Sequence, residues 1–340
     1  MGVLESPEAS VEAYFTERLD RGGLRLAGRW LASEGWSDET GFLTFHTGSG
    51  EELRLVVRRY RAAGVSRGET DPERHFRVLR AMSTTGVPVP RVLWFDAEGD
   101  LFDGPFFVME AVAGFAPVPW SPEGRRFLAE AGSGPPGRQF VDILAAIHAV
   151  DWRSVGLADL GDAVTPTGFA AESVARLRGR LDAAEDEPEP ILADGIGWLS
   201  THLPERGAVT VVHGDYRTGN LLFTGDQISA VLDWEFARIG DPYYDLGWVC
   251  APTNRTGSDL VCMLLPQAEF LSRYADATGS GIDDASLRFW ITYHQVQHAV
   301  RWLEGAAAFS AGTNTDLRLA RAYYTMPALR RIVADLLEYA

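Results

Sequence analysis

Short apolar runs separated by turn residues occupy the first third of the chain, a pattern typical of β-strands. The runs that predict strands are 24–33, 42–46, 53–60, 92–95 and 106–111, and the polar or glycine-bearing segments 34–41 and 47–50 predict turns. Asp71 followed by Pro72 predicts a helix start, and the helix should continue to about Thr84. We therefore expect a five-stranded, mostly antiparallel sheet with one inserted helix.

Beyond residue 112 the apolar positions recur at the spacing of amphipathic helices. After a connector with proline and glycine at 113–122, helices are predicted at 138–150, 170–184, 191–202, 258–278, 284–303 and 316–339. Strands are predicted within 208–233, and turns at 132–137 and 305–315. The chain should therefore be an α+β protein of two domains. Residues 1–111 would form an N-terminal lobe of antiparallel sheet plus helix, and 112–340 a mainly helical C-terminal lobe with a short β island.

Composition places the chain among ordinary globular proteins, with 46% hydrophobic and 23% charged residues in 340. No apolar run approaches the roughly 18 residues of a membrane span. The first residues, MGVLESPEAS, lack the basic and apolar pattern of a secretion signal. With only two cysteines a disulfide framework is not expected. These features predict a cytoplasmic protein that does not act on membranes.

The charge balance narrows the function classes. The formal net charge is −16, whereas nucleic-acid binding proteins usually carry a basic surface, so we do not expect a nucleic-acid partner. All 31 basic residues of the Lys+Arg count are arginine, and the sequence has no lysine. This excludes P-loop and Schiff-base chemistry, both of which require a lysine. Any cation that binds a nucleotide must be an arginine.

The polar residues that point to chemistry follow a short buried strand at 209–212. His213, Asp215 and Asn220 have the spacing H-x-D-x-x-x-x-N, and Asp233 ends a strand further along the chain. This arrangement is the kinase pattern, although Asp-Trp-Glu stands here where protein kinases have Asp-Phe-Gly. Phosphoryl transfer needs positioning, neutralisation of phosphate charge and a group that orients the attacking hydroxyl. The spacing therefore predicts a kinase-type active site.

A hairpin would bring the polar residues together. If its turn is centred between Asp226 and Gln227, Asn220 and Asp233 are equidistant from the turn and face each other. Opposed residues on paired strands have Cβ atoms about 5 Å apart. An amide oxygen and a carboxylate so placed can share a hard cation such as Mg²⁺. Asp215 would lie on the loop that enters the same corner and accept the proton of an attacking hydroxyl.

Four segments resemble the aminoglycoside phosphotransferase and choline kinase-like family, particularly its branch related to the kinase domains fused to acyl-CoA dehydrogenases. They are HGDYRTGN, LDWEFARIGDPYYDLGW, TGVPVPRVLW and GPFFVMEAVAG, and the resemblance extends over about residues 25–305. It implies a protein kinase-like two-lobed fold and transfer of the γ-phosphate of ATP or GTP to a small acceptor, with Mg²⁺ as cofactor. The acceptor hydroxyl would belong to an aminoglycoside, another antibiotic, an amino alcohol or a hydroxyacyl-CoA.

The resemblance also implies roles for individual residues of the catalytic segment. Asp215 corresponds to the catalytic base, and Arg217 to a cation directed at the γ-phosphate. Asn220 and Asp233 correspond to the Mg²⁺ ligands.

The resemblance also implies residues that bind the nucleotide. Arg58 corresponds to the strand cation on the α- and β-phosphates, and Ser37 with its neighbours to the loop that covers the phosphates. Glu110 to Val112 correspond to the hinge that contacts the base. Arg59 follows Arg58 directly, and either could instead be a solvated surface charge.

Two departures from the family pattern keep an alternative open. The family usually has Arg-Glu early in the inserted helix, where the glutamate pairs with the strand cation, but this chain has Arg74-His75. Glu73 lies two residues from His75, on a nearly opposite helix face. The phosphate loop, 34–41, is also poor in glycine. The alternative is a nucleotide-binding pseudokinase without transfer activity.

A third hypothesis is a metal-dependent hydrolase with His213, Asp215 and Asp233 as ligands, for which the paired-histidine spacing is absent.

Several other polar residues are expected to be structural. His213 should order the catalytic loop, and His148 should be a satisfied core histidine. Asp241 before Pro242 is typical of an N-cap followed by a first helical position, and the resemblance implies that Asp241 and Asp245 brace the catalytic loop. Glu235 shares a strand face with Asp233 and is expected to have no direct role. The helical stripe in 284–303 is expected to pack into the core; it comprises Trp290, His294, Gln297, His298, Arg301 and Trp302.

Overall fold

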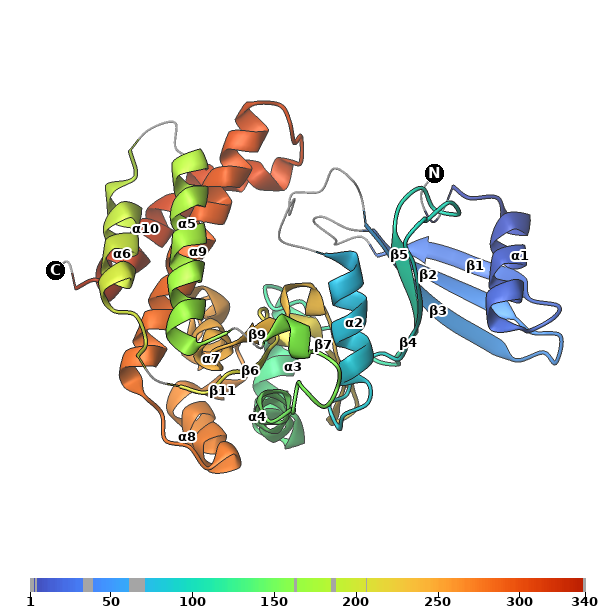
Figure 1. The fold of residues 1–340 in the computed structure, drawn as a ribbon, viewed down its shortest axis with the longest axis horizontal. Coiled ribbons are helices and arrows are strands. Elements are labelled where there is room, and N and C mark those ends of the chain that lie inside the picture. Colours follow the sequence, from blue (N-terminus) through green and yellow to red (C-terminus); the bar gives the residue numbers. More distant parts are fainter. Residues whose placement is uncertain are drawn as a thin grey trace. The chain divides into compact units, whose positions relative to one another are not determined.

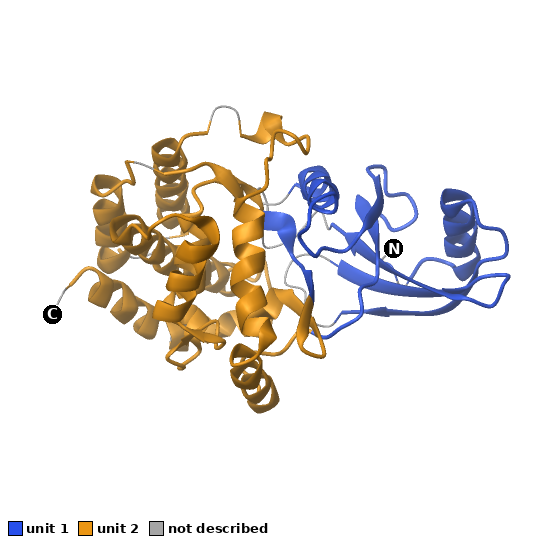
Figure 2. Cartoon of the chain, turned by 90° about the horizontal axis from the view of Figure 1, so that it is seen from below, with its two compact units in different colours: residues 1–115, 229–236 blue, residues 116–228, 237–340 orange. Residues whose placement is uncertain are grey.

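The computed structural model describes residues 3, 5–32, 39–60, 71–161, 164–184, 188–205 and 207–338. The chain divides into two units, residues 1–115 with 229–236 and residues 116–228 with 237–340 (Figure 2). The predicted division into an N-terminal lobe, 1–111, and a C-terminal lobe, 112–340, stays a prediction. The units group 112–115 and 229–236 with the sheet, so Asp233 belongs to the first unit.

The first unit is built on one sheet (Figure 1). Its strands are β1 (Arg25–Leu31), β2 (Glu39–His46), β3 (Glu52–Arg59), β4 (Val92–Asp96) and β5 (Phe106–Glu110), in the order β1-β2-β3-β5-β4. Every neighbouring pair is antiparallel. Burial alternates along β2, as it does when one face of a sheet packs on a core. The predicted sheet is confirmed, although β2 begins at Glu39, inside the segment expected to be a turn.

Two helices complete the first unit. α2 (Pro72–Met82) begins as predicted, because the Asp71 side chain accepts the backbone N–H groups of Glu73 and Arg74 at 3.0 and 3.1 Å. α1 (Glu8–Leu19) was not predicted. It has no side-chain N-cap and buries only Val11 and Phe15. Its apolar side is therefore too narrow to produce a clear helical pattern, and packing on the sheet core stabilises it.

The second unit is mainly helical, as predicted. Its helices are α3 (Pro122–Gly132), α4 (Pro135–His148), α5 (Pro166–Ala184), α6 (Pro190–Thr201), α7 (Tyr243–Cys250), α8 (Gln267–Thr278), α9 (Asp284–Ser310) and α10 (Ala322–Leu336). α9 packs against α5, α6, α7 and α10 and contributes Phe289, Trp290 and Val296 to their shared core. The longest helix of the described chain thus forms the centre of this unit.

Three pairs of short strands form around the catalytic segment. β6 (Thr210–Val212) pairs antiparallel with β9 (Arg238–Gly240), β7 (Leu221–Thr224) with β8 (Gln227–Val231), and β10 (Leu260–Val261) with β11 (Leu265–Pro266). Single turns of 3-10 helix, η2 (Thr218–Asn220) and η3 (Trp234–Phe236), follow the catalytic loop and β8. The predicted β island is therefore present, with β9 as an additional strand.

Some predicted boundaries were wrong for local reasons. The helix expected at 258–278 begins only at Gln267, because Cys262 and Met263 have positive φ angles of 48° and 57°, which an α-helix cannot contain. The turn expected at 305–315 is helical up to Ser310. The connector expected at 113–122 ends at Ser121, whose hydroxyl caps α3.

Candidate active site

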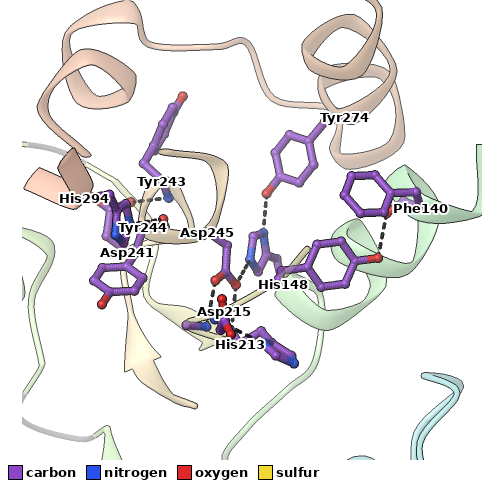
Figure 3. A network of polar contacts seen from close by, with 12 residues as sticks. Phe140, His148, His213, Asp215, Asp241, Tyr243, Tyr244, Asp245, Tyr274 and His294 are labelled. Atoms are coloured by element: carbon purple, nitrogen blue, oxygen red, sulfur yellow. Dashed lines mark hydrogen bonds and ion pairs between the residues drawn. The ribbon is translucent and has the colours of Figure 1, made fainter. Parts of the chain in front are cut away.

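Asp245 on α7 organises the loop that carries the predicted catalytic residues (Figure 3). Its Oδ2 and Oδ1 accept the backbone N–H groups of His213 at 2.7 Å and Gly214 at 2.8 Å. Gly214 has a φ of +84°, a left-handed conformation that glycine adopts without steric cost. This turn directs two consecutive amides at one carboxylate. The contacts confirm the bracing role expected of Asp245.

A buried polar network holds Asp245 in place. The Nε2–H of His148 on α4 donates to its Oδ2 at 3.1 Å, and Nδ1 of the same ring lies 2.6 Å from the Tyr274 hydroxyl on α8 (Figure 3). Burial by itself would raise the pKa of Asp245, but the bond from His148 and the interactions with His213 lower it below its ordinary value. Asp245 is therefore an ionised acceptor for three N–H groups, and His148 is the satisfied core histidine that was predicted.

The His213 ring fixes the start of the loop. Its Nδ1 accepts the backbone N–H of Asp215 at 3.1 Å, and the buried ring meets that of Tyr216 edge-on at 5.9 Å. The Tyr216 hydroxyl in turn donates to the carbonyl of Phe140 at 2.8 Å. Because Nδ1 is already engaged, His213 orders the loop as predicted, and a metal-ligand role for that nitrogen is disfavoured.

The structure brings two of the predicted site residues, Asn220 and Arg217, to the carboxylate of a third, Asp215. Asn220 Nδ2 lies 2.7 Å from its Oδ2 and 2.9 Å from its backbone oxygen, and Arg217 Nε lies 3.2 Å from its Oδ1. The Asp215 side chain is 19% exposed. It is therefore held in one orientation and is still partly exposed to solvent.

The orientation of the Asn220 amide follows from its partners. Both neighbours of Nδ2 are acceptors on Asp215, so this atom must be the nitrogen. Within the described part of the chain, the remaining Oδ1 accepts no hydrogen bond that the structure shows. Asn220 therefore keeps a carbonyl oxygen of the kind that hard cations bind.

Two contacts that sequence reasoning missed hold η2. The Thr218 hydroxyl donates to the carbonyl of Cys262 at 3.0 Å, which ties the loop to the turn between β10 and β11. A Cβ at position 219 would collide with Nη1 of Arg217, so Gly219 leaves room for the guanidinium beside Asp215. In the sequence, the only sign that room is kept for the Arg217 side chain is the glycine two residues after it.

In the first unit, the two adjacent arginines of β3 have different surroundings. Arg58 Nη1 donates to Thr40 Oγ1 at 3.0 Å and lies 3.4 Å from Asp233 Oδ1, while its Nη2 lies 2.9 Å from Glu235 Oε2. Its side chain is 14% exposed. The alternative of a solvated surface charge is therefore wrong for Arg58, and Glu235, expected to have no direct role, is one of its partners.

Arg59 lies on the opposite face of the strand. Its Nη1 is 3.1 Å from Glu39 Oε2, and its Nη2 donates to the carbonyl of Asp103 at 2.7 Å. Both Arg59 and Glu39 are buried. The structure thus separates a structural arginine from Arg58, which shares its face with Asp233.

Asp233 follows β8 in an unusual backbone conformation. Its φ is +58°, which is uncommon outside glycine and clusters at functional sites, and its side chain is 42% exposed. The hairpin turn consists of Gly225 and Asp226, so its centre lies one residue earlier than predicted, where Gly225 adopts a φ of +59°. Asn220 and Asp233 fall in different units, and their predicted approach stays a prediction.

The predicted nucleotide contacts are described only in part. Ser37 lies in 33–38, outside the described residues. The amides of Glu110 and Ala111 donate to the carbonyls of Arg91 and Arg54 at 3.0 and 3.1 Å, so the sheet uses both. Val112 follows them directly. Contacts of Glu110 and Val112 with a base stay a prediction.

The inserted helix has a different partner from the one the family pattern predicts. His75 is buried, its Nδ1 lies 2.5 Å from the Tyr60 hydroxyl, and its ring meets that of Phe107 edge-on at 5.0 Å. Glu73 is exposed. At the position where the family has a glutamate for the strand cation, α2 therefore carries a residue of the core.

Asp241 links two helices of the second unit. Its Oδ1 accepts the N–H of Tyr243 at 2.9 Å, which is the capping contact predicted, and its Oδ2 accepts Nε1–H of Trp290 on α9 at 2.9 Å. Burial raises the pKa of Asp241 to about 6. Since both oxygens serve α7 and α9, the expectation that Asp241 braces the catalytic loop is corrected.

The stripe on α9 packs inward over most of its length. Trp290, His294 and Gln297 are buried, and Nε2–H of His294 donates to the carbonyl of Tyr244 at 2.7 Å. Burial lowers the pKa of His298 to about 4, with smaller effects from Arg301 and Asp215. The core interpretation is confirmed for the first three residues.

Within the described ranges, no helix is both long and apolar enough to cross a membrane.

This loop geometry agrees with the comparison to known families. The profile of the APH family, described as a phosphotransferase enzyme family, matches residues 32–290, which contain every predicted site residue. The chain belongs to this family. This family is described as one of phosphotransferase enzymes, and the chain is called the phosphotransferase below.

The phosphotransferase also has curated relatives in sequence. The chain is 30% identical over 207 residues to acyl-CoA dehydrogenase family member 10 of Mus musculus, a match that covers 58% of this chain but 18% of that protein. The chain thus spans about a fifth of the curated relatives it matches.

A solved putative aminoglycoside phosphotransferase from Ralstonia eutropha has a TM-score of 0.75 and 23% identity, with 99% of both chains covered. Aminoglycoside phosphotransferase APH(4)-Ia, solved as a thermostable mutant with ADP and hygromycin B, has a TM-score of 0.60 and 18% identity, with 95% of this chain and 98% of that one covered. The predicted kinase-like α+β fold is confirmed.

Proposed function

We propose that this phosphotransferase moves the γ-phosphate of ATP or GTP onto a hydroxyl of a small-molecule acceptor, with Asp215 as the base. The observation that carries the proposal is the environment of the Asp215 carboxylate. His213 holds its backbone amide, while Asn220 and Arg217 hold its side chain. A carboxylate fixed in this way, but 19% exposed, suits a group that must meet a hydroxyl in one orientation.

The step at Asp215 is a proton transfer. The hydroxyl of the acceptor donates a hydrogen bond to a lone pair of the carboxylate. As the hydroxyl oxygen bonds to the γ-phosphorus, its proton moves to Asp215, the bond between the γ-phosphorus and the oxygen bridging to the β-phosphate breaks, and ADP or GDP leaves. Asn220 keeps the carboxylate from rotating. Arg217, next to it, is the cation available for the charge on the transferred group.

Asn220 and Asp233 fit Mg²⁺ by their chemistry. Asn220 offers an amide oxygen because both its N–H groups point at Asp215, and Asp233 offers a carboxylate that is 42% exposed. Bound Mg²⁺ would neutralise charge on the nucleotide phosphates. We propose that these two residues hold it.

Arg58 is proposed as the cation on the α- and β-phosphates, in a chain that has no lysine. Guanidinium groups bind phosphate oxygens through two parallel hydrogen bonds, so arginine suits this task. Ser37 in the covering loop, with Glu110 and Val112 at the base, completes the proposed nucleotide site. The ADP complex of APH(4)-Ia supports a nucleotide as donor.

The acceptor is proposed from the classes that the relatives suggest. The solved neighbours named above are aminoglycoside phosphotransferases, and the curated match is an acyl-CoA dehydrogenase family member. A screen should therefore contain aminoglycosides, macrolides, amino alcohols and hydroxyacyl-CoA thioesters. The assay is acceptor-dependent release of ADP or GDP.

The first test of the proposal is thermal stabilisation by ATP and GTP with Mg²⁺. A nucleotide at about 100 times its dissociation constant should add roughly 2.7 kcal/mol to the free energy of unfolding. Asp233→Ala should weaken this stabilisation. Asp215→Asn should keep it and lower acceptor turnover by about 10²- to 10⁴-fold.

The outcomes separate the alternatives. If neither nucleotide stabilises the wild type, the kinase proposal is wrong. If nucleotide binds but no acceptor is ever phosphorylated, the pseudokinase alternative is correct. Turnover that survives Asp215→Asn would remove Asp215 from the proposed mechanism.

A further inference from the structure

We infer that Glu235 is the positioning residue for Arg58, in place of the helix glutamate that this chain lacks, and that it couples the phosphate-binding arginine to the proposed metal ligand Asp233. This inference rests on the proposed function. The pair consists of Arg58 on β3 and Glu235 on η3, 177 residues apart in sequence and both in the first unit.

The first argument is the geometry of the pair. Arg58 Nη2 lies 2.9 Å from Glu235 Oε2, and their side chains are only 14% and 11% exposed. A cation this deeply placed needs a counter-charge, because an uncompensated charge is costly away from water. A charge-assisted bond of this length also restricts the side-chain rotamers of Arg58. Glu235 therefore meets both requirements of a positioning residue.

The second argument is what occupies the helix. His75 on α2 is committed to the core through Tyr60 and Phe107, and Glu73 is exposed. A kinase-type site needs the phosphate-binding cation ordered by a carboxylate. Here that carboxylate comes from the segment after β8. The departure at His75 is therefore matched by Glu235 and does not by itself indicate a disabled site.

The third argument is the support of Glu235 itself. It belongs to a single helical turn that starts directly after Asp233, whose φ of +58° redirects the chain. α2 packs against this turn. The Trp234 indole ties the turn to the end of β8, because its Nε1–H donates to the Val231 carbonyl at 3.0 Å. Packing thus holds Glu235 where Arg58 meets it.

The coupling follows from the shared guanidinium. Arg58 contacts Glu235 through Nη2 and approaches Asp233 through Nη1, at 2.9 and 3.4 Å. With Glu235 in place, Arg58 has a buried partner and the more exposed Asp233 can serve a cation. Without it, the positive charge of Arg58 would turn to Asp233 and compete with Mg²⁺ there.

The test measures ADP affinity by calorimetry in variants of two carboxylates of the same unit. Each variant is measured with Mg²⁺ and with EDTA, and no acceptor is present. Glu235→Gln removes the partner of Arg58. The matched control, Glu12→Gln, removes the carboxylate that lies 3.1 Å from Arg25 Nη1, an ion pair of the same unit that lies outside the proposed nucleotide-binding residues. We expect at least tenfold weaker ADP binding for Glu235→Gln in EDTA and a further loss with Mg²⁺. The control should stay within twofold of wild type.

A double-mutant cycle adds a readout that a purely structural role would not change. Arg58→Gln and Glu235→Gln should each weaken ADP binding, and the double variant should be little worse than the worse single variant. Glu235→Asp, which keeps the charge on a shorter side chain, should bind ADP with intermediate affinity. This milder variant also serves if Glu235→Gln does not fold.

Three results would overturn the inference. One is ADP affinity of Glu235→Gln within twofold of wild type, and another is full additivity with Arg58→Gln. In both cases wild-type binding would leave the proposed function standing. If wild-type protein binds neither ADP nor GDP, the proposed function and the inference fail together.

Discussion

Asp245→Asn is the substitution whose effect can be worked out most fully from the structure. The carboxylate accepts three N–H groups, buried ones from His213 and His148 at Oδ2 and a part-buried one from Gly214 at Oδ1. An amide has a single oxygen. Placed at the Oδ2 position, it keeps two donors but turns its own NH₂ group toward the Gly214 amide. The other orientation loses two donors, so the first is preferred.

The cost is the sum of two effects. One part-buried donor, the Gly214 amide, is left without an acceptor, which costs about 1–3 kcal/mol, and the surviving bonds no longer involve a charged acceptor. We expect the free energy of unfolding to fall by about 3 kcal/mol. Because Gly214 loses its anchor, the Asp215 carboxylate loses its fixed position as well. The rate of phosphoryl transfer should therefore fall more than nucleotide affinity does.

The assays are denaturant unfolding, nucleotide binding and acceptor turnover on the same preparations. Asp142→Asn is the matched control, because Asp142 is an exposed residue on α4 and surface changes usually stay within about 0.5 kcal/mol. A loss below about 1 kcal/mol for Asp245→Asn, with wild-type turnover, would refute the reasoning that this carboxylate holds the loop.

Three further substitutions have expected outcomes. Burial raises the pKa of Asp241 to about 6, above its unfolded value of 3.8, so the native state binds the extra proton between these values. As the pH falls from 7 to 4, the free energy of unfolding of the wild type should rise by up to about 3 kcal/mol relative to that of Asp241→Asn. Denaturant unfolding at each pH measures this difference, and a pH-independent difference would contradict the prediction. Gly214→Ala should cost about 1–2 kcal/mol in thermal or denaturant unfolding, because the φ of +84° is unfavourable for alanine. Asn220→Asp places a carboxylate against two oxygen acceptors of Asp215, which should repel it. Acceptor turnover should fall at least tenfold, while the ADP affinity measured by calorimetry without metal should stay within threefold of wild type.

Much of the fold could be predicted because its signals are local. The strands of the first sheet follow from short apolar runs, and the start of α2 follows from the capping chemistry of Asp71 and Pro72. The kinase-type loop was recognisable because the spacing of His213, Asp215 and Asn220 lies within eight residues. Residues so close in sequence can contact one another through the local backbone conformation, with little help from distant segments.

Other features depend on which surfaces meet in the folded chain. α1 exists because Phe15 reaches the sheet core, and the helix predicted from 258 was displaced by two left-handed residues in a turn bonded to Thr218. The hairpin turn moved by one residue because Gly225 took the left-handed position. Propensity alone does not discriminate between such alternatives, since packing shifts element boundaries by a few residues.

The amino-acid sequence by itself indicated the family, the proposed catalytic loop and the requirement that any phosphate-binding cation be an arginine. Only the tertiary structure showed that the two adjacent arginines of β3 have different partners. It separated Arg58 from Arg59 by placing them on opposite faces of β3, and it joined Arg58 to Glu235 across 177 residues. The physical reason is that a buried charge takes its partner from whatever packing brings within about 3 Å, and sequence distance does not limit that choice.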